Sequence, residues 1–131
     1  NQIQYVSDFY LKKNIRNIDS KDALNKILKI KGKKFQLKNS NKESHGFIAQ
    51  EVEKVIPDIV EQNDNFKTMD YIGIMPFLVE SIREQQKQIN QLNQSIKQLK
   101  KMIAEESEAK YRAYVKFADL QKQQHDNKTS T

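Results

Sequence analysis

The pattern of apolar and polar positions changes character at about Phe77, where short mixed segments give way to one long repeat. Isoleucine recurs there every seven residues and leucine fills most of the alternate positions, at Ile82, Ile89, Ile96 and Ile103 with Leu78, Leu92 and Leu99. No glycine or proline interrupts the repeat. This heptad, with isoleucine at a and leucine at d, is typical of a coiled coil.

Polar residues break the heptad at Gln85, Glu106 and Lys110, after which Ala113, Phe117 and Leu120 resume it. We therefore expect the coiled coil to span residues 77–124 and a disordered polar tail to follow at 125–131. The breaks leave open whether the helix folds back after Ile103. Isoleucine at a with leucine at d favours parallel dimers in model peptides.

Before the coiled coil, Asp19 or Ser20 is suited to cap a helix that ends at Gly32. Its apolar face consists of Ala23, Leu24, Ile27 and Leu28. A strand is expected at 34–38, with Phe35 and Leu37 on one side, and a polar loop at 39–44.

A second helix is predicted from Gly46 to Pro57, which stops it. Its inward positions are Ile48, Val52, Val55 and Ile56. Strands at 58–62 and 66–71 around the turn at 63–65 predict a hairpin, and Pro76 suits the first turn of the last helix. We therefore expect an α+β, mainly helical fold class: a small head with short helices and a β-hairpin, followed by a long C-terminal helix that forms a coiled coil.

With 131 residues, 37% hydrophobic and 31% charged, the chain has room for one modest core. It lacks cysteine, a bilayer-spanning apolar run and a signal pattern, so we expect no membrane contact within this segment. Because the chain begins at Asn1 without methionine, we expect it to be a piece of a longer protein. The alternating residues 1–6 predict a short strand.

The net charge of +6 raises the possibility of a polyanionic partner, and the densest basic cluster is residues 29–34. Nucleic acid is nevertheless the less favoured partner, because aromatic residues do not alternate with these lysines. His45 and His125 lie far apart without partner ligands, and three glycines make no phosphate loop. We therefore expect no metal and no cofactor.

Candidate chemistry lies near the N-terminus, where Ser7 and Lys12 stand five positions apart just after Val6. A serine with a lysine base is a known nucleophile-and-base pair. The spacing alone is weak support, because lysine is abundant in this sequence. Lys12 must also lose its proton, although a free lysine has a pKa of about 10.4, so desolvation or a nearby cation is required.

Further segments stand in order downstream of this pair: Gly46-Phe47-Ile48-Ala49-Gln50-Glu51-Val52-Glu53-Lys54-Val55-Ile56-Pro57, Asp70-Tyr71, and Leu78-Val79-Glu80-Ser81-Ile82-Arg83-Glu84-Gln85-Gln86. Together they resemble the intramolecular chaperone, or peptidase S74, domain from about Ser7 to Ile89. The chain has Tyr10 where the family usually has arginine and Leu37 where it usually has tryptophan.

The resemblance implies a homotrimer that helps an upstream passenger domain of the same polypeptide to fold and then cuts itself off between Val6 and Ser7. It implies Ser7 and Lys12 as the catalytic residues of a self-cleaving serine endopeptidase, a head at 7–76, and residues 1–6 as the remnant of the passenger. Such domains occur in phage tailspikes and tail fibres, which favours a virus particle or its assembly site. Membrane-tethered transcription factors are the runner-up context.

Three other residues are supporting candidates: Asp8 through a turn hydrogen bond, His45 as an oxyanion donor or a neighbouring subunit's contribution, and Gln50 at an interface. Each also has an ordinary structural explanation, as a turn, an exposed loop histidine and a buried polar group. Two alternatives stay open for the whole chain, a trimeric assembly module that does not cut and a basic coiled-coil protein that binds nucleic acid.

Overall fold

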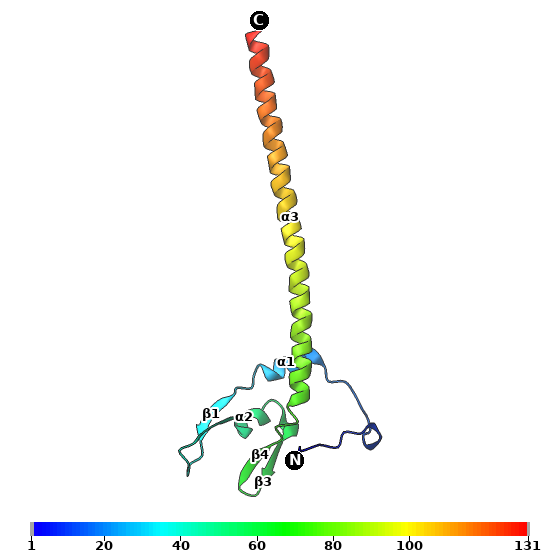
Figure 1. The fold of residues 1–131 in the computed structure, drawn as a ribbon, viewed down its shortest axis with the longest axis vertical. Helices are drawn as coiled ribbons and strands as arrows, with labels where there is room; N and C mark the ends of the chain where they lie inside the picture. The colour runs from blue at the N-terminus through cyan, green and yellow to red at the C-terminus, as the bar shows by residue number, and fades with distance from the viewer. Residues whose placement is uncertain (1, 131) are drawn as a thin grey trace. The chain divides into compact units, whose positions relative to one another are not determined.

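The computed structural model describes residues 2–130. Its contacts divide the chain into two compact units, Asn1–Gln86 and Lys87–Thr131. Both hairpins and all the short helices belong to the first unit, and the long helix α3 (Met75–Thr129) supplies the whole regular structure of the second. Figure 1 traces these elements in chain order.

Helix α1 (Ser20–Ile27) begins where the sequence predicts, because the Asp19 carboxylate accepts a hydrogen bond of 2.7 Å from the Asp22 N–H. It ends at Ile27, well before Gly32. Ala23 and Leu24 are buried, as predicted. Leu28 was expected on the same apolar face, but it follows the last helical residue and is 67% exposed.

The first hairpin pairs β1 (Lys33–Gln36) with β2 (Glu43–Gly46), antiparallel, with Lys33 opposite Gly46. The prediction of a polar loop over 39–44 followed directly by a helix was therefore wrong in part. The residues of β2 show no apolar alternation, so only pairing with β1 makes them a strand. Leu37 lies beyond β1 and is exposed, so Phe35 is the one apolar residue of this strand that is half-buried, next to the half-buried Lys33.

The second helix, α2 (Ala49–Glu53), is shorter than predicted but buries Val52. Helix α2 ends at Glu53, so the prediction that Pro57 stops it was wrong, and Pro57 instead opens the 3-10 turn η2 (Pro57–Ile59). The second hairpin is confirmed: β3 (Val60–Asn63) pairs with β4 (Phe66–Met69) around the predicted turn.

The buried core of the first unit is small and lies between α2, η2 and the start of α3. Val52, Ile56, Ile59 and Ile74 form its centre. Partly buried side chains surround it, namely Ile27, Ile30, Phe47, Val55, Val60, Met69 and Phe77. Ile48 was expected to face inward but is 38% exposed, because it stands at the cap of α2 rather than within the helix.

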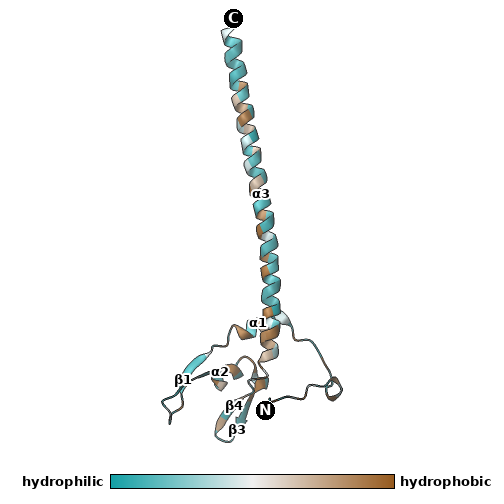
Figure 2. Ribbon diagram, in the orientation of Figure 1, coloured by the Kyte–Doolittle hydropathy of each residue, from teal (hydrophilic) through white to brown (hydrophobic). Residues whose placement is uncertain are grey.

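Helix α3 is continuous, so the chain does not fold back after Ile103. Pro76 lies in its first turn, as predicted. The helix also continues through residues 125–129, which corrects the expected disordered tail, while Thr131 lies outside the described residues. Figure 2 shows apolar positions recurring between hydrophilic ones along this helix.

Residues 2–8 form neither helix nor strand, so the strand predicted for residues 1–6 is absent from the described part, and Asn1 lies outside it. Alternation of polar and apolar residues makes a strand only where a second strand supplies hydrogen bonds. Within residues 2–130 the strands pair only as β1 with β2 and β3 with β4.

Candidate functional site

A single turn of 3-10 helix, η1 (Phe9–Leu11), organises the N-terminal candidate residues. Asp8 caps this turn, because its carboxylate Oδ1 accepts a hydrogen bond of 2.8 Å from the Tyr10 N–H. The backbone closes the turn with a bond of 3.0 Å from the Lys12 N–H to the Phe9 carbonyl. Residues on either side of the turn are therefore drawn together.

Lys12 and Ser7 meet across this turn, with Lys12 Nζ 2.7 Å from Ser7 Oγ. The amine donates to the hydroxyl in this hydrogen bond. The same separation lets a neutral amine accept the hydroxyl proton, since nucleophile and base act within about 2.6–3.2 Å of each other. The turn thus places Ser7 and Lys12 in contact, and Asp8 caps the turn between them.

Water reaches this arrangement freely in the single chain, because Ser7 and Lys12 are both exposed. The apolar side chains around them are exposed as well, with Val6 at 81% and Tyr10 at 90%. We call this set the N-terminal apolar segment: Ile3, Tyr5, Val6, Phe9, Tyr10, Leu11 and Ile15. Seven exposed apolar side chains therefore lie within residues 3–15.

His45 and Gln50 do not join the pair within one chain. His45 lies on β2, exposed, with Nε2 3.7 Å from the Glu43 carboxylate. Gln50 lies on α2 and is exposed. Among residues 2–130, neither side chain hydrogen-bonds to Ser7 or Lys12.

The segment Gly46-Phe47 has a structural role in the first unit. The Phe47 N–H donates a hydrogen bond of 3.1 Å to the Tyr71 hydroxyl, and the two rings pack with their centroids 5.6 Å apart. A Cβ on Gly46 would lie 2.5 Å from that hydroxyl oxygen and 3.3 Å from Phe35 Cε1, so a larger residue here requires the Tyr71 side chain to shift. The contact between Phe47 and Tyr71 thus joins the residue after β2 to the segment just before α3.

A buried polar contact that the sequence did not predict joins α1 to α3. Ser20 Oγ donates a hydrogen bond of 3.1 Å to Glu84 Oε2, and Glu84 is 7% exposed. The two residues stand 64 positions apart. A buried glutamate in a helix otherwise rich in glutamine and lysine carries no local pattern, so nothing in the sequence singles it out.

Neither a metal site nor a membrane span emerges from the described residues. Within residues 2–130, no three histidine or acidic side chains gather to hold a metal ion. In the same part of the chain, no helix is both long and apolar enough to cross a bilayer.

The described residues combine a short capped turn that carries a serine–lysine contact, a head with two hairpins, and a long helix. Residues 7–61 match the family model of the peptidase S74 domain, the chaperone of endosialidase, and the match begins at Ser7. This match supports the intramolecular chaperone family for the segment and, with it, a C-terminal chaperone role. No curated protein is similar enough to count as a relative.

Proposed function

We propose that the chain is a C-terminal intramolecular chaperone that trimerises, assists the folding of an upstream passenger and releases itself by cutting between Val6 and Ser7. The observation that carries the cleavage proposal is the 2.7 Å contact between Lys12 Nζ and Ser7 Oγ. Membership of residues 7–61 in the chaperone of endosialidase family supports the chaperone role.

In the proposed reaction, Ser7 Oγ attacks the carbonyl carbon of Val6 while the neutral Lys12 amine takes the hydroxyl proton. The proton then passes to the Ser7 nitrogen as the Val6–Ser7 amide bond breaks, leaving Val6 joined to the Ser7 oxygen as an ester. Water hydrolyses this ester. The products are a carboxylate on Val6 and a free amine on Ser7.

Assembly is the proposed switch for this reaction. Water surrounds the Lys12 side chain in the single chain, where it is exposed, whereas burial of an amine favours its neutral form. A neighbouring subunit that covers the N-terminal apolar segment also removes water from Lys12. Cleavage then depends on correct assembly, and it serves as a check on folding.

The proposed assembly has three chains held by a coiled coil along α3. Support for the coil comes from the exposed isoleucines at a positions, such as Ile82, Ile89 and Ile103, which lie on one stripe of a continuous helix. The core residues alone favour two strands, and the family resemblance favours three. We expect the head to decide the number, because its exposed apolar segment adds contacts that the coil lacks.

A non-cleaving assembly module is the second candidate. The observation that favours it is the departure at Tyr10, which is 90% exposed and stands where the family usually has arginine. Binding of nucleic acid has less support, because Lys33 and Lys34 already pair with Glu51 and Glu43, at 3.2 and 3.5 Å.

The deciding experiment expresses the chain behind its native upstream passenger and follows the products on a denaturing gel. We expect a cut immediately before Ser7 that Ser7→Ala and Lys12→Ala both abolish. Lys13→Ala is the matched control, because it removes the adjacent lysine and leaves the Lys12–Ser7 contact in place. A full-length product from well-formed trimers refutes cleavage and leaves the assembly module.

A further inference from the structure

Residues 2–6, just before the proposed cleavage site, have the sequence of a strand but no strand partner. Glutamine alternates there with Ile3 and Tyr5. Within the described part of the chain, these residues belong to no sheet and form no hydrogen bond. Ile3 is 80% exposed and Tyr5 is 65% exposed. A segment with this alternation and with free backbone groups is suited to pair with the edge of a sheet.

The proposed cleavage requires these residues to be held in place. Ser7 Oγ attacks the carbonyl carbon of Val6, so the chain on both sides of that bond must be fixed relative to the Lys12–Ser7 contact. The capped turn η1 fixes the side that follows the bond. On the side that precedes it, residues 2–6 have no such contact among the described residues. The single chain therefore fixes only half of the segment to be cut.

Both hairpins of the first unit have free edges. Each sheet has two strands, so every strand keeps one edge unpaired within residues 2–130. Lysine side chains disfavour the addition of a further strand, and they stand on β1 at Lys33 and Lys34 and on β4 at Lys67. Strands β2 and β3 carry neither lysine nor proline. These two strands therefore offer the more open edges.

An aromatic pocket of about 470 Å³ lies at the end of β2. Both strands of the first hairpin line it, together with Gly32, Phe47 and Tyr71. Its two lysines, Lys33 and Lys34, already pair with carboxylates at 3.2 and 3.5 Å. The rings of Phe47 and Tyr71 are thus the contact that this pocket offers to an uncharged segment such as residues 2–6.

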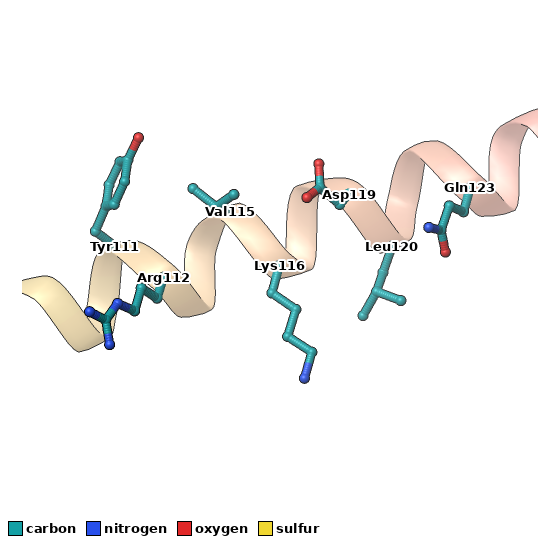
Figure 3. Close-up of a pocket in the computed structure, with 7 residues that line it drawn as sticks. All are labelled: Tyr111, Arg112, Val115, Lys116, Asp119, Leu120 and Gln123. Carbon is teal, nitrogen blue, oxygen red and sulfur yellow. The ribbon is translucent and has the colours of Figure 1, made fainter.

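The other pockets fit residues 2–6 less well. The pocket beside β3 carries the carboxylates of Asp58, Glu61 and Asp70, and residues 2–6 have no positive charge to place against them. A further pocket lies along α3, where Figure 3 shows apolar side chains at Val115 and Leu120 among charged ones. The backbone groups of a helix bond within the helix, so this surface cannot accept a strand.

We infer that residues 2–6 pair as an added strand with the free edge of β2 in a neighbouring subunit, and that this pairing holds the Val6–Ser7 bond for cleavage. Both the segment and the edge stay unpaired within one chain, so the contact belongs to assembled chains. Main-chain hydrogen bonds supply the affinity, and the aromatic pocket receives side chains from one face of the added strand. This inference rests on the proposed assembly and self-cleavage.

Disulfide crosslinking tests the contact, because the chain contains no cysteine of its own. Gln4→Cys is combined in turn with Ser44→Cys and with His45→Cys, in the full chain carrying Ser7→Ala so that residues 1–6 stay attached. Neighbouring residues of β2 point to opposite faces, so we expect one of the two combinations to crosslink and the other to stay uncrosslinked. The crosslinked product on a non-reducing gel contains more than one chain.

The matched control combines Gln4→Cys with Gln62→Cys, which places the second thiol on β3. We expect these chains to stay separate on the gel. Crosslinking to β3, crosslinking within one chain, or no crosslink in chains that assemble overturns this inference while the proposed function stands. Chains that remain monomeric overturn the proposed assembly and, with it, this inference.

Proline substitution gives a second readout, which is cleavage of the chain behind its native passenger. A proline removes one N–H, and only alternate N–H groups of an added strand point toward its partner. We therefore expect one of Ile3→Pro and Gln4→Pro to slow cleavage roughly fivefold to tenfold relative to alanine at the same position, and the other to leave it unchanged. The mass of the assembly should not change in either variant.

Equal effects of the two prolines, including no effect of either, overturn the pairing of residues 2–6 with a strand edge. A wild-type chain that assembles but does not cut overturns the proposed cleavage instead, and the crosslink then decides the pairing by itself.

Discussion

Ser20 donates a hydrogen bond to the buried carboxylate of Glu84, which ties the first turn of α1 to the early part of α3. We expect Ser20→Ala to lower the free energy of unfolding by about 1–3 kcal/mol, because the buried Glu84 side chain loses one of its hydrogen-bond donors. Urea denaturation at fixed protein concentration measures this loss. Ser95→Ala, at an exposed position on α3, is the control and should leave the midpoint unchanged.

The Lys12→Arg variant tests whether Lys12 acts as a base or only as a positive charge. A guanidinium keeps the charge and can still donate to Ser7, but it does not lose its proton in proteins. We therefore expect the variant to assemble normally and to leave the passenger attached, as judged by the mass of the assembly and by a denaturing gel. Lys13→Arg should cut normally. Cleavage by the Lys12→Arg variant would exclude the lysine as the base.

Asp8 acts in this proposal as a positioning residue, through its hydrogen bond to the Tyr10 N–H. Asp8→Ala removes the cap of η1, so the Lys12–Ser7 contact forms less often and we expect cleavage to slow by roughly fivefold. Asp8→Asn keeps the acceptor oxygen and should cut at nearly the normal rate. An equal loss in both variants would point to the charge of Asp8 rather than its capping bond.

Gly46→Ala tests the fit beneath Tyr71. The new Cβ would lie 2.5 Å from the Tyr71 hydroxyl oxygen, so we expect the thermal midpoint to fall, with a cost of about 1–3 kcal/mol. Gly32→Ala is the matched control, since nothing lies within 4 Å of its added Cβ. Combining Gly46→Ala with Tyr71→Phe removes the clashing oxygen and should recover part of the loss.

Ile96→Lys places a charge at an a position of the proposed coiled coil. We expect the chain to become monomeric at micromolar concentration and the passenger to remain attached, because cleavage depends on assembly. Gln94→Lys adds the same charge at an outer position and should change neither property. Sedimentation and the denaturing gel give the two readouts. Cleavage by a monomeric Ile96→Lys variant would contradict the proposal that cleavage depends on assembly.

Local chemistry in the sequence predicted several elements of this fold correctly. The heptad and the absence of glycine and proline from residue 77 onward indicate a long helix, and Pro76 marks its first turn. Asp19 identifies the start of α1, and the turn at 63–65 identifies the second hairpin. Each of these signals depends on residues within a few positions of one another, so no distant partner is needed to interpret it.

In the candidate site, too, the features set by neighbouring residues could be predicted and those set by distant residues could not. The spacing of Ser7 and Lys12 suggested a pair, and the Asp8 cap that closes the turn is equally local. Strand β2 could not be predicted, because its polar residues become a strand only when β1 pairs with them. The Ser20–Glu84 bond and the fit of Tyr71 over Gly46 were also missed, since each joins residues far apart in sequence.

The sequence by itself thus determined the long helix, the capped helix and turn, and the residues available for chemistry, because backbone preferences and side-chain periodicity act over a few residues. Only the tertiary structure decided which polar residues form β2, which carboxylate is buried, and that His45 and Gln50 stay apart from Ser7 within one chain. Those outcomes depend on packing between distant segments, where burial and hydrogen-bond partners are set by the whole fold.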